Sequence, residues 1–352
     1  MPSAVRQSNF ELLRCVCMLM VLNLHSFWGY EYGTGVLQSL DFVRESFSIC
    51  AVDCFVLISG YFSIKWKWTS FYNLIFQILF YAFVIYLVCV GIGLFEFEKS
   101  QLLECFKSLY KFWGFITSYL ILYFLSPLLN AFTEKTNNKN LLLYIIILFF
   151  AENFILCSVT DHLNFCLLYL VGRWISKTSA LDKIPFNPIK GYVVCSMIIF
   201  VMVYFLYLKF HLNAKQMQGL FVGYSYSSPF VILQAVFLFL AFGKLKMQNR
   251  FVNWCAVSCL SVFLIHMHPS IKDIGYYGFT KELYQKDFHE HILFLLVLMI
   301  SVFFASILID KVRIGISLVC EKMLAIVFSW IKPLMIRLLG KFEDEKNVTE
   351  NR

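Results

Sequence analysis

The sequence predicts an all-α integral membrane protein with about ten transmembrane helices and a C-terminal basic amphipathic helix. Three observations lead to this prediction. Of the 352 residues, 60% are hydrophobic and only 15% are charged, with a mean hydropathy of +0.71. The apolar runs are longer than the core of a soluble domain needs. The basic residues between these runs gather at alternate connections, as they do in multi-pass membrane proteins.

The apolar runs are the first element of the prediction. A helix needs about 20 apolar residues to cross a bilayer, and ten segments meet this requirement or approach it. The sixth and eighth segments are short, so the count of ten carries a margin of one or two. The segments are residues 10–29, 46–63, 71–95, 113–131, 141–158, 163–176, 191–211, 229–243, 254–271 and 292–310.

The charge distribution predicts the orientation of these helices. Ten crossings place both termini on the same side of the membrane. If that side is the cytoplasm, it receives 21 of the 30 Lys and Arg residues, which is the bias that cytoplasmic loops carry. Topology therefore accounts for the net charge of +8. Because the basic residues do not cluster on a soluble face, no nucleic acid is predicted as a partner.

The connections between the apolar segments are too short to form soluble domains. The longest, about 30–45, 96–112 and 272–291, cannot bury a core of their own, so residues 1–312 are predicted to form a single membrane domain. Residues 313–352 mix apolar residues with Lys and Arg. This pattern predicts a cytoplasmic amphipathic helix on the membrane surface, followed by a polar tail. An eleventh span is the competing interpretation.

The cysteines do not indicate a disulfide framework or a metal site. There are twelve, and most lie inside apolar segments, without a CxxC motif or regular spacing. A free cysteine in such a segment behaves as a small hydrophobic residue. We therefore expect neither disulfides nor bound zinc.

Two polar residues of the first apolar segment, Arg14 and His25, are the main candidates for function. Eleven helical steps carry the chain about 20° beyond three full turns and about 16.5 Å along the axis, so the two side chains share one face. Burial of either group is costly unless it has a partner or a role. In the alternative interpretation, Arg14 is an interfacial anchor paired with Glu11, and His25 binds a carbonyl near the outer interface.

Four stretches of the chain, in order, resemble the membrane acyltransferase family 3. "RCVCMLMVLNLH" has an Arg, ten further residues and a His, as in the opening signature of the family. "VDCFVLISGYF" resembles its second-helix phrase, which ends in Ser-Gly-Tyr. "FWGFITSYLILYFLSPLLN" and "SVFLIHMHPSIK" resemble its Trp-and-Tyr segment and its late Leu-Ile-His helix. Together these stretches span most of the chain.

The resemblance implies an enzyme that transfers an acyl group, usually acetyl from acetyl-CoA, to a hydroxyl of a carbohydrate or a lipid-linked glycan. It implies a multi-pass protein of the bacterial cytoplasmic (inner) membrane that contacts membrane lipid and works alone or with partners of glycan assembly. Arg14 is then expected to bind a phosphate of the donor. His25 is expected to act as a general base or to carry the acyl group itself.

Other residues are predicted to support the donor side of the site. Asp53, a carboxylate within the second segment, is expected to orient His25 or pair with Arg14, or else to bind a loop cation. Lys65 and Lys67 are candidates for contacts with CoA phosphates, although some family members carry an Arg pair near this point. The Trp residues beside these lysines suit the membrane interface. Arg173 is either a donor contact or an interfacial anchor.

Three more residues are candidates for the acceptor side. Trp113 and Tyr119 offer aromatic faces that suit sugar rings, and His266 matches the late His of the family. A place in the core or at the membrane interface is the competing interpretation for each of them. Gly60, in the Ser-Gly-Tyr phrase, is expected to allow close helix packing.

Two further functions are kept open. The first is a transporter of lipid-linked sugar or small anions, which would also bury Arg, Asp and His side chains. The absence of clear internal repeats and of paired broken helices disfavours it. The second is acylation of a membrane lipid or of a small metabolite. It differs from the predicted glycan acyltransferase in the acceptor alone.

Overall fold

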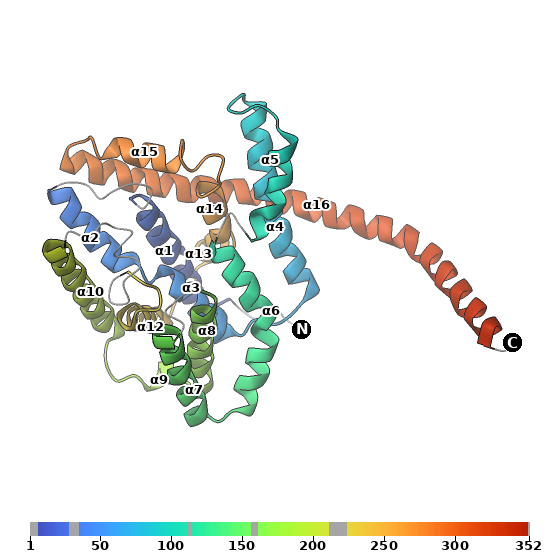
Figure 1. The fold of residues 1–352 in the computed structure, drawn as a ribbon, viewed down its shortest axis with the longest axis horizontal. Coiled ribbons are helices and arrows are strands. Elements are labelled where there is room, and N and C mark those ends of the chain that lie inside the picture. The colour runs from blue at the N-terminus through green and yellow to red at the C-terminus, as the bar shows by residue number, and fades with distance from the viewer. Residues whose placement is uncertain (1–5, 28–34, 111–113, 156–160, 211–223, 351–352) are drawn as a thin grey trace.

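The computed structural model describes residues 6–27, 35–110, 114–155, 161–210 and 224–350. This part of the chain is helical and contains no strand. Figure 1 shows a bundle of helices and one long helix, α16, whose C-terminal half leaves the bundle. The prediction of an all-α protein is therefore confirmed.

A helix lies on each of the ten predicted segments. Asparagine side chains cap two of them: Asn137 accepts a hydrogen bond from the backbone N–H of Asn140, and Asn249 accepts two, from Phe251 and Val252. In chain order the helices are α1 (Ser8–His25), α3 (Ala51–Phe62), α4 (Trp68–Gly91), α6 (Gly114–Lys135), α7 (Asn138–Phe150) with the π-helical turn η2 (Ala151–Ile155), α8 (Asp161–Thr178), α10 (Pro188–Phe210), α12 (Pro229–Gly243), the pair α13 (Arg250–Ala256) and α14 (Cys259–His266), and α16 (Phe288–Glu350).

Short helices in the connections were not predicted. The longest is α2 (Val36–Ser48), whose buried residues include Asp41 and Glu45 as well as Phe42. Its charged residues made the segment look like a loop. The others are α5 (Lys99–Glu104) with the 3₁₀ turn η1 (Cys105–Leu109), α9 (Ala180–Lys183) and α15 (Tyr276–Leu283).

Four of the described helices are long and apolar enough to cross a membrane: α4, α6, α10 and the part of α16 from Phe288 to Val319. Their outer surfaces carry exposed apolar side chains, including Val88 on α4, Val201 and Phe205 on α10, and Leu293 on α16. Such a surface suits contact with lipid rather than water. The structure thus supports a membrane protein, while ten crossings and the orientation of the termini stay predictions.

Helix α16 is continuous from Phe288 to Glu350. The predicted boundary between a membrane domain and a surface helix, at residues 312/313, therefore lies inside a helix. At about 1.5 Å per residue, the 63 residues of α16 extend for about 95 Å. The placement of its C-terminal half on a membrane surface stays a prediction.

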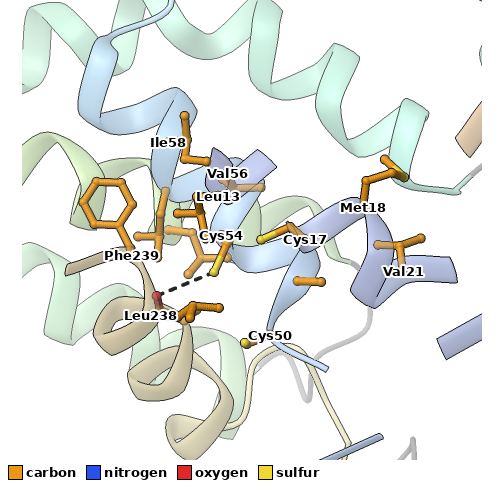
Figure 2. Packing of buried hydrophobic residues seen from close by; sticks show 14 of the residues in the cluster. Leu13, Cys17, Met18, Val21, Cys50, Cys54, Val56, Ile58, Leu238 and Phe239 are labelled. Atoms are coloured by element: carbon orange, nitrogen blue, oxygen red, sulfur yellow. Dashed lines mark hydrogen bonds between the residues drawn. The ribbon is translucent and has the colours of Figure 1, made fainter. Parts of the chain in front are cut away.

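Helices α1, α3, α8 and α12 contribute many of the residues of the main buried apolar cluster. At the contact between α3 and α8, a Cβ on Gly60 would collide with the carbonyl oxygen of Tyr169, and one on Gly172 would lie 2.5 Å from that of Leu57. The two glycines thus let the backbones touch, as expected for Gly60. Figure 2 shows Cys17, Cys50 and Cys54 among the apolar side chains where α1, α3 and α12 meet.

Polar contacts tie together connections that the charge pattern predicts on one side of the membrane. Asn9 donates to the carbonyl oxygen of Phe242, and Lys244 donates to that of Ile184. Lys177 donates to the carbonyl oxygen of Thr133. These contacts gather the start of α1 and the ends of α6, α8 and α12 at one end of the bundle. The C-terminal end of α1, with His25, lies toward the other end.

Candidate functional site

A cavity of about 740 Å³ runs along one face of α1. The residues of α1 that line it include Glu11, Arg14, Met18, Val21 and His25. Their spacing of three or four residues is that of a single helical face. The prediction that Arg14 and His25 share a face is therefore confirmed, and both side chains open onto the same space, about 16.5 Å apart along the axis.

The rest of the wall is mostly apolar and aromatic. Phe55 and Ser59 come from α3, Phe115 and Tyr119 from α6, and Phe263 from α14. The Tyr119 hydroxyl lies 3.4 Å from the Ser59 hydroxyl. Cavities of this size with a mostly apolar lining and a few polar groups are typical of sites for small organic ligands.

The end of the cavity near the start of α1 is charged. Arg14 Nη1 donates to Glu11 Oε1 at 2.9 Å, and the Glu11 side chain is only 9% exposed, against 31% for Arg14. The pairing with Glu11, which belonged to the alternative interpretation of Arg14 as an anchor, is thus confirmed, and Arg14 also lines the cavity. Arg6, which precedes α1, lines the same end. Two guanidinium groups and one carboxylate leave a net positive charge there.

At the other end of the cavity, the lining residue His25 contacts a second histidine, His266. His25 Nδ1 lies 2.8 Å from His266 Nε2, and both side chains are buried. His266 Nδ1 in turn lies 2.5 Å from the carbonyl oxygen of Val262, one turn earlier in α14. The Tyr276 ring packs against the His266 ring with centroids 5.3 Å apart, and the Tyr276 hydroxyl donates to the Leu22 carbonyl oxygen.

A buried ionic network holds the end of α1 beside His25. Arg44 of α2 donates through Nε to Asn23 Oδ1 and through Nη1 to Asp41 Oδ1, both at 2.8 Å, and through Nη2 to the Ser26 hydroxyl. Tyr284 donates to the second carboxylate oxygen of Asp41. This network was not predicted from the sequence. The spacing of Asp41 and Arg44, which places them on one helical face, was the available signal.

The structure brings some of the predicted residues together and leaves others apart. Arg14, His25 and Tyr119 line the cavity, and His266 contacts His25. Asp53 is fully buried in α3, but it is not among the described residues that line the cavity.

The remaining predicted donor contacts lie elsewhere. Lys65 and Lys67 are exposed and Arg173 is partly buried, and none of the three belongs to the described lining of the cavity. Trp113 lies outside the described residues. The charged groups that the structure does place beside the cavity are those of Arg6, Glu11 and Arg14.

A family described as "Acyltransferase domain" matches residues 7–311, which include every cavity residue named above except Arg6. No curated protein matches the chain, and no solved structure does.

Proposed function

This chain belongs to the acyltransferase family, and we propose that it is a membrane-embedded O-acyltransferase that uses acyl-CoA. In this proposal it moves an acetyl or another short acyl group to a hydroxyl of a surface polysaccharide or of its lipid-linked precursor, in the bacterial inner membrane. The observation that carries the proposal is the cavity that Arg14 and His25 line at opposite ends.

The length of the cavity suits an extended donor. The separation of about 16.5 Å between the two residues along α1 is of the same order as the CoA arm between its phosphates and its sulfur. Arg14 uses one N–H for Glu11, and a guanidinium has four more. These can bind a donor phosphate, while Arg6 adds positive charge at the same end. The thioester then reaches the histidine end.

At that end His25 would remove a proton from the acceptor. As the hydroxyl oxygen attacks the thioester carbon, its proton passes to the imidazole, the new C–O bond forms and the C–S bond breaks. The imidazolium returns the proton to the departing thiolate, which gives the ester and CoA–SH. In the two-step alternative, Nε2 of the imidazole attacks the thioester carbon first, the C–S bond breaks and CoA leaves as the thiolate. The acceptor hydroxyl then attacks the acyl group, the N–C bond breaks, and the hydroxyl proton passes through the freed imidazole to the thiolate.

Transfer of label from acetyl-CoA tests this function. Native membranes that contain the protein are incubated with acetyl-labelled acetyl-CoA, and the host glycan is then examined by NMR for ester acetyl groups. We expect label in glycan with the protein and none in membranes without it. Label in a lipid or in a small metabolite would show that the acceptor is that molecule and not a glycan. Protein-dependent movement of lipid-linked sugar across the membrane without any label transfer would favour a transporter.

Replacement of Arg14 tests the donor end separately. We expect Arg14→Ala to raise the KM for acetyl-CoA by about 10- to 100-fold, because a hydrogen bond to a charged group contributes about 1.5–3 kcal/mol. Arg14→Lys retains the charge and should raise this KM by a smaller factor. The matched control is Lys246→Ala, which removes an exposed cation at the same end of the bundle. An unchanged KM in Arg14→Ala would remove Arg14 from the donor site.

A further inference from the structure

The contact between the two buried histidines suggests a role for His266 that differs from acceptor binding. We propose that His266 is a positioning residue: it fixes the orientation of the His25 ring and keeps its proton on Nδ1, so that Nε2 is the reactive nitrogen. This inference rests on the proposed function, because it assigns a role to His266 within the same reaction.

The direction of the hydrogen bonds follows from the atom at the end of the chain. A backbone carbonyl oxygen can only accept, so His266 Nδ1, which lies 2.5 Å from the Val262 carbonyl oxygen, carries a hydrogen. In a neutral His266 ring, Nε2 is then an acceptor. His25 Nδ1 lies 2.8 Å from that Nε2 and must therefore be the donor. A neutral His25 with a proton on Nδ1 has its lone pair on Nε2.

The same arrangement suits the step in which His25 gains a proton. When Nε2 takes the hydroxyl proton, the imidazolium keeps its Nδ1–H bond to His266, and this bond becomes charge-assisted and stronger. His266 thus stabilises the charged intermediate without moving. In the two-step route, the same lone pair on Nε2 receives the acyl group, so the role of His266 does not depend on which route operates.

The surroundings hold His266 in place. The residue is 4% exposed, Nδ1 of its ring is hydrogen-bonded to the backbone of its own helix, and the Tyr276 ring packs on it. The Phe263 ring lies 6.1 Å from both imidazole rings, measured between centroids. His25 lines the cavity, whereas His266 is not among its described lining residues. This placement fits a residue that acts through His25 rather than one that binds substrate.

The test combines spectroscopy with kinetics. In protein labelled with ¹⁵N-histidine, the His25 signals are assigned by their loss in His25→Ala, and the ¹⁵N shifts of Nδ1 and Nε2 report which nitrogen carries the proton. We expect a protonated Nδ1 in wild type and in His266→Gln, whose amide oxygen can accept the same bond. We expect a mixture of both tautomers in His266→Ala.

The kinetic effect should fall on kcat rather than on substrate binding. We expect His266→Ala to lower kcat by about 10- to 100-fold, a part of what a well-placed general base contributes, with the KM for acetyl-CoA and for the acceptor unchanged. His266→Gln should recover most of this loss. The matched control is His268→Ala, which removes a buried imidazole two residues away that bonds the Ala82 carbonyl oxygen. It should leave the His25 tautomer unchanged.

Two results would overturn the inference. One is a wild-type His25 with its proton on Nε2. The other is a His266→Ala protein that keeps the Nδ1 proton on His25, whether its transfer is normal or its KM for the acceptor has risen. The tautomer measurement needs no acyl transfer. If the wild-type protein transfers no acyl group, the proposed function fails, and the catalytic role of His266 fails with it. A change of the His25 tautomer in His266→Ala would still establish that His266 orients the His25 ring.

Discussion

His25→Ala is expected to abolish acyl transfer while the protein still folds and inserts. His25 is the group proposed to take the proton of the acceptor, and a general base contributes about 10²- to 10⁴-fold in rate; the loss is larger still if His25 carries the acyl group. The measurement is the initial rate of label transfer from saturating acetyl-CoA in membranes, normalised to the amount of protein.

The control for this variant is His289→Ala. His289 lies in the first turn of α16, is exposed and does not line the cavity among the described residues, so its loss should leave transfer at the wild-type rate. The thermal midpoint of the purified His25→Ala protein shows whether the fold is intact. A folded His25→Ala protein that transfers label within about twofold of wild type would contradict the site assignment.

Gly60→Ala is expected to have the largest effect on stability. A Cβ at this position collides with the backbone of Tyr169, and a backbone cannot move aside as the end of a side chain can. Helices α3 and α8 would have to separate, and overpacking of this kind costs about 1–3 kcal/mol. We expect a lower thermal midpoint in detergent and a smaller fraction of monodisperse protein after heating.

Gly91→Ala is the matched control for this substitution. Gly91 is the last residue of α4, and a Cβ there meets nothing within 4 Å. Because Ala favours a helix by up to about 1 kcal/mol over Gly, this variant should be as stable as wild type or slightly more stable. Equal stability of the Gly60→Ala and Gly91→Ala proteins would show that α3 and α8 do not pack as closely as described.

The sequence predicted the elements of the fold well because apolar length is a local property. It placed a helix on each of the ten segments, but it did not predict the interruption between α13 and α14, where Val257 and Ser258 separate two short helices within an apolar run. It also did not predict α2. The charged residues Asp41, Arg44 and Glu45 indicated an exposed connection, whereas the structure largely buries them in a helix.

The candidate site was predictable in part for the same reason. The common face of Arg14 and His25 follows from helical periodicity alone, as does the pairing of Arg14 with Glu11. The contact between His25 and His266 joins residues 241 positions apart, and only the packing of α1 against α14 brings them together. Lys65 and Lys67 were predicted as donor contacts from their charge and their place in the sequence. Whether such side chains reach the cavity depends on how the helices pack, and the sequence does not show this.

The state of the cysteines has a practical consequence for mapping topology. The ten cysteines in the described part of the chain are free and buried, so impermeant maleimides should find few native thiols to label in the folded protein. Single cysteines introduced at exposed connections, such as Lys246 and Lys286, would then report which face of the bilayer each connection occupies, in intact cells and without rebuilding the core. Cys157 and Cys320 lie outside those ten, so both would be replaced in the parent protein that receives the single cysteines.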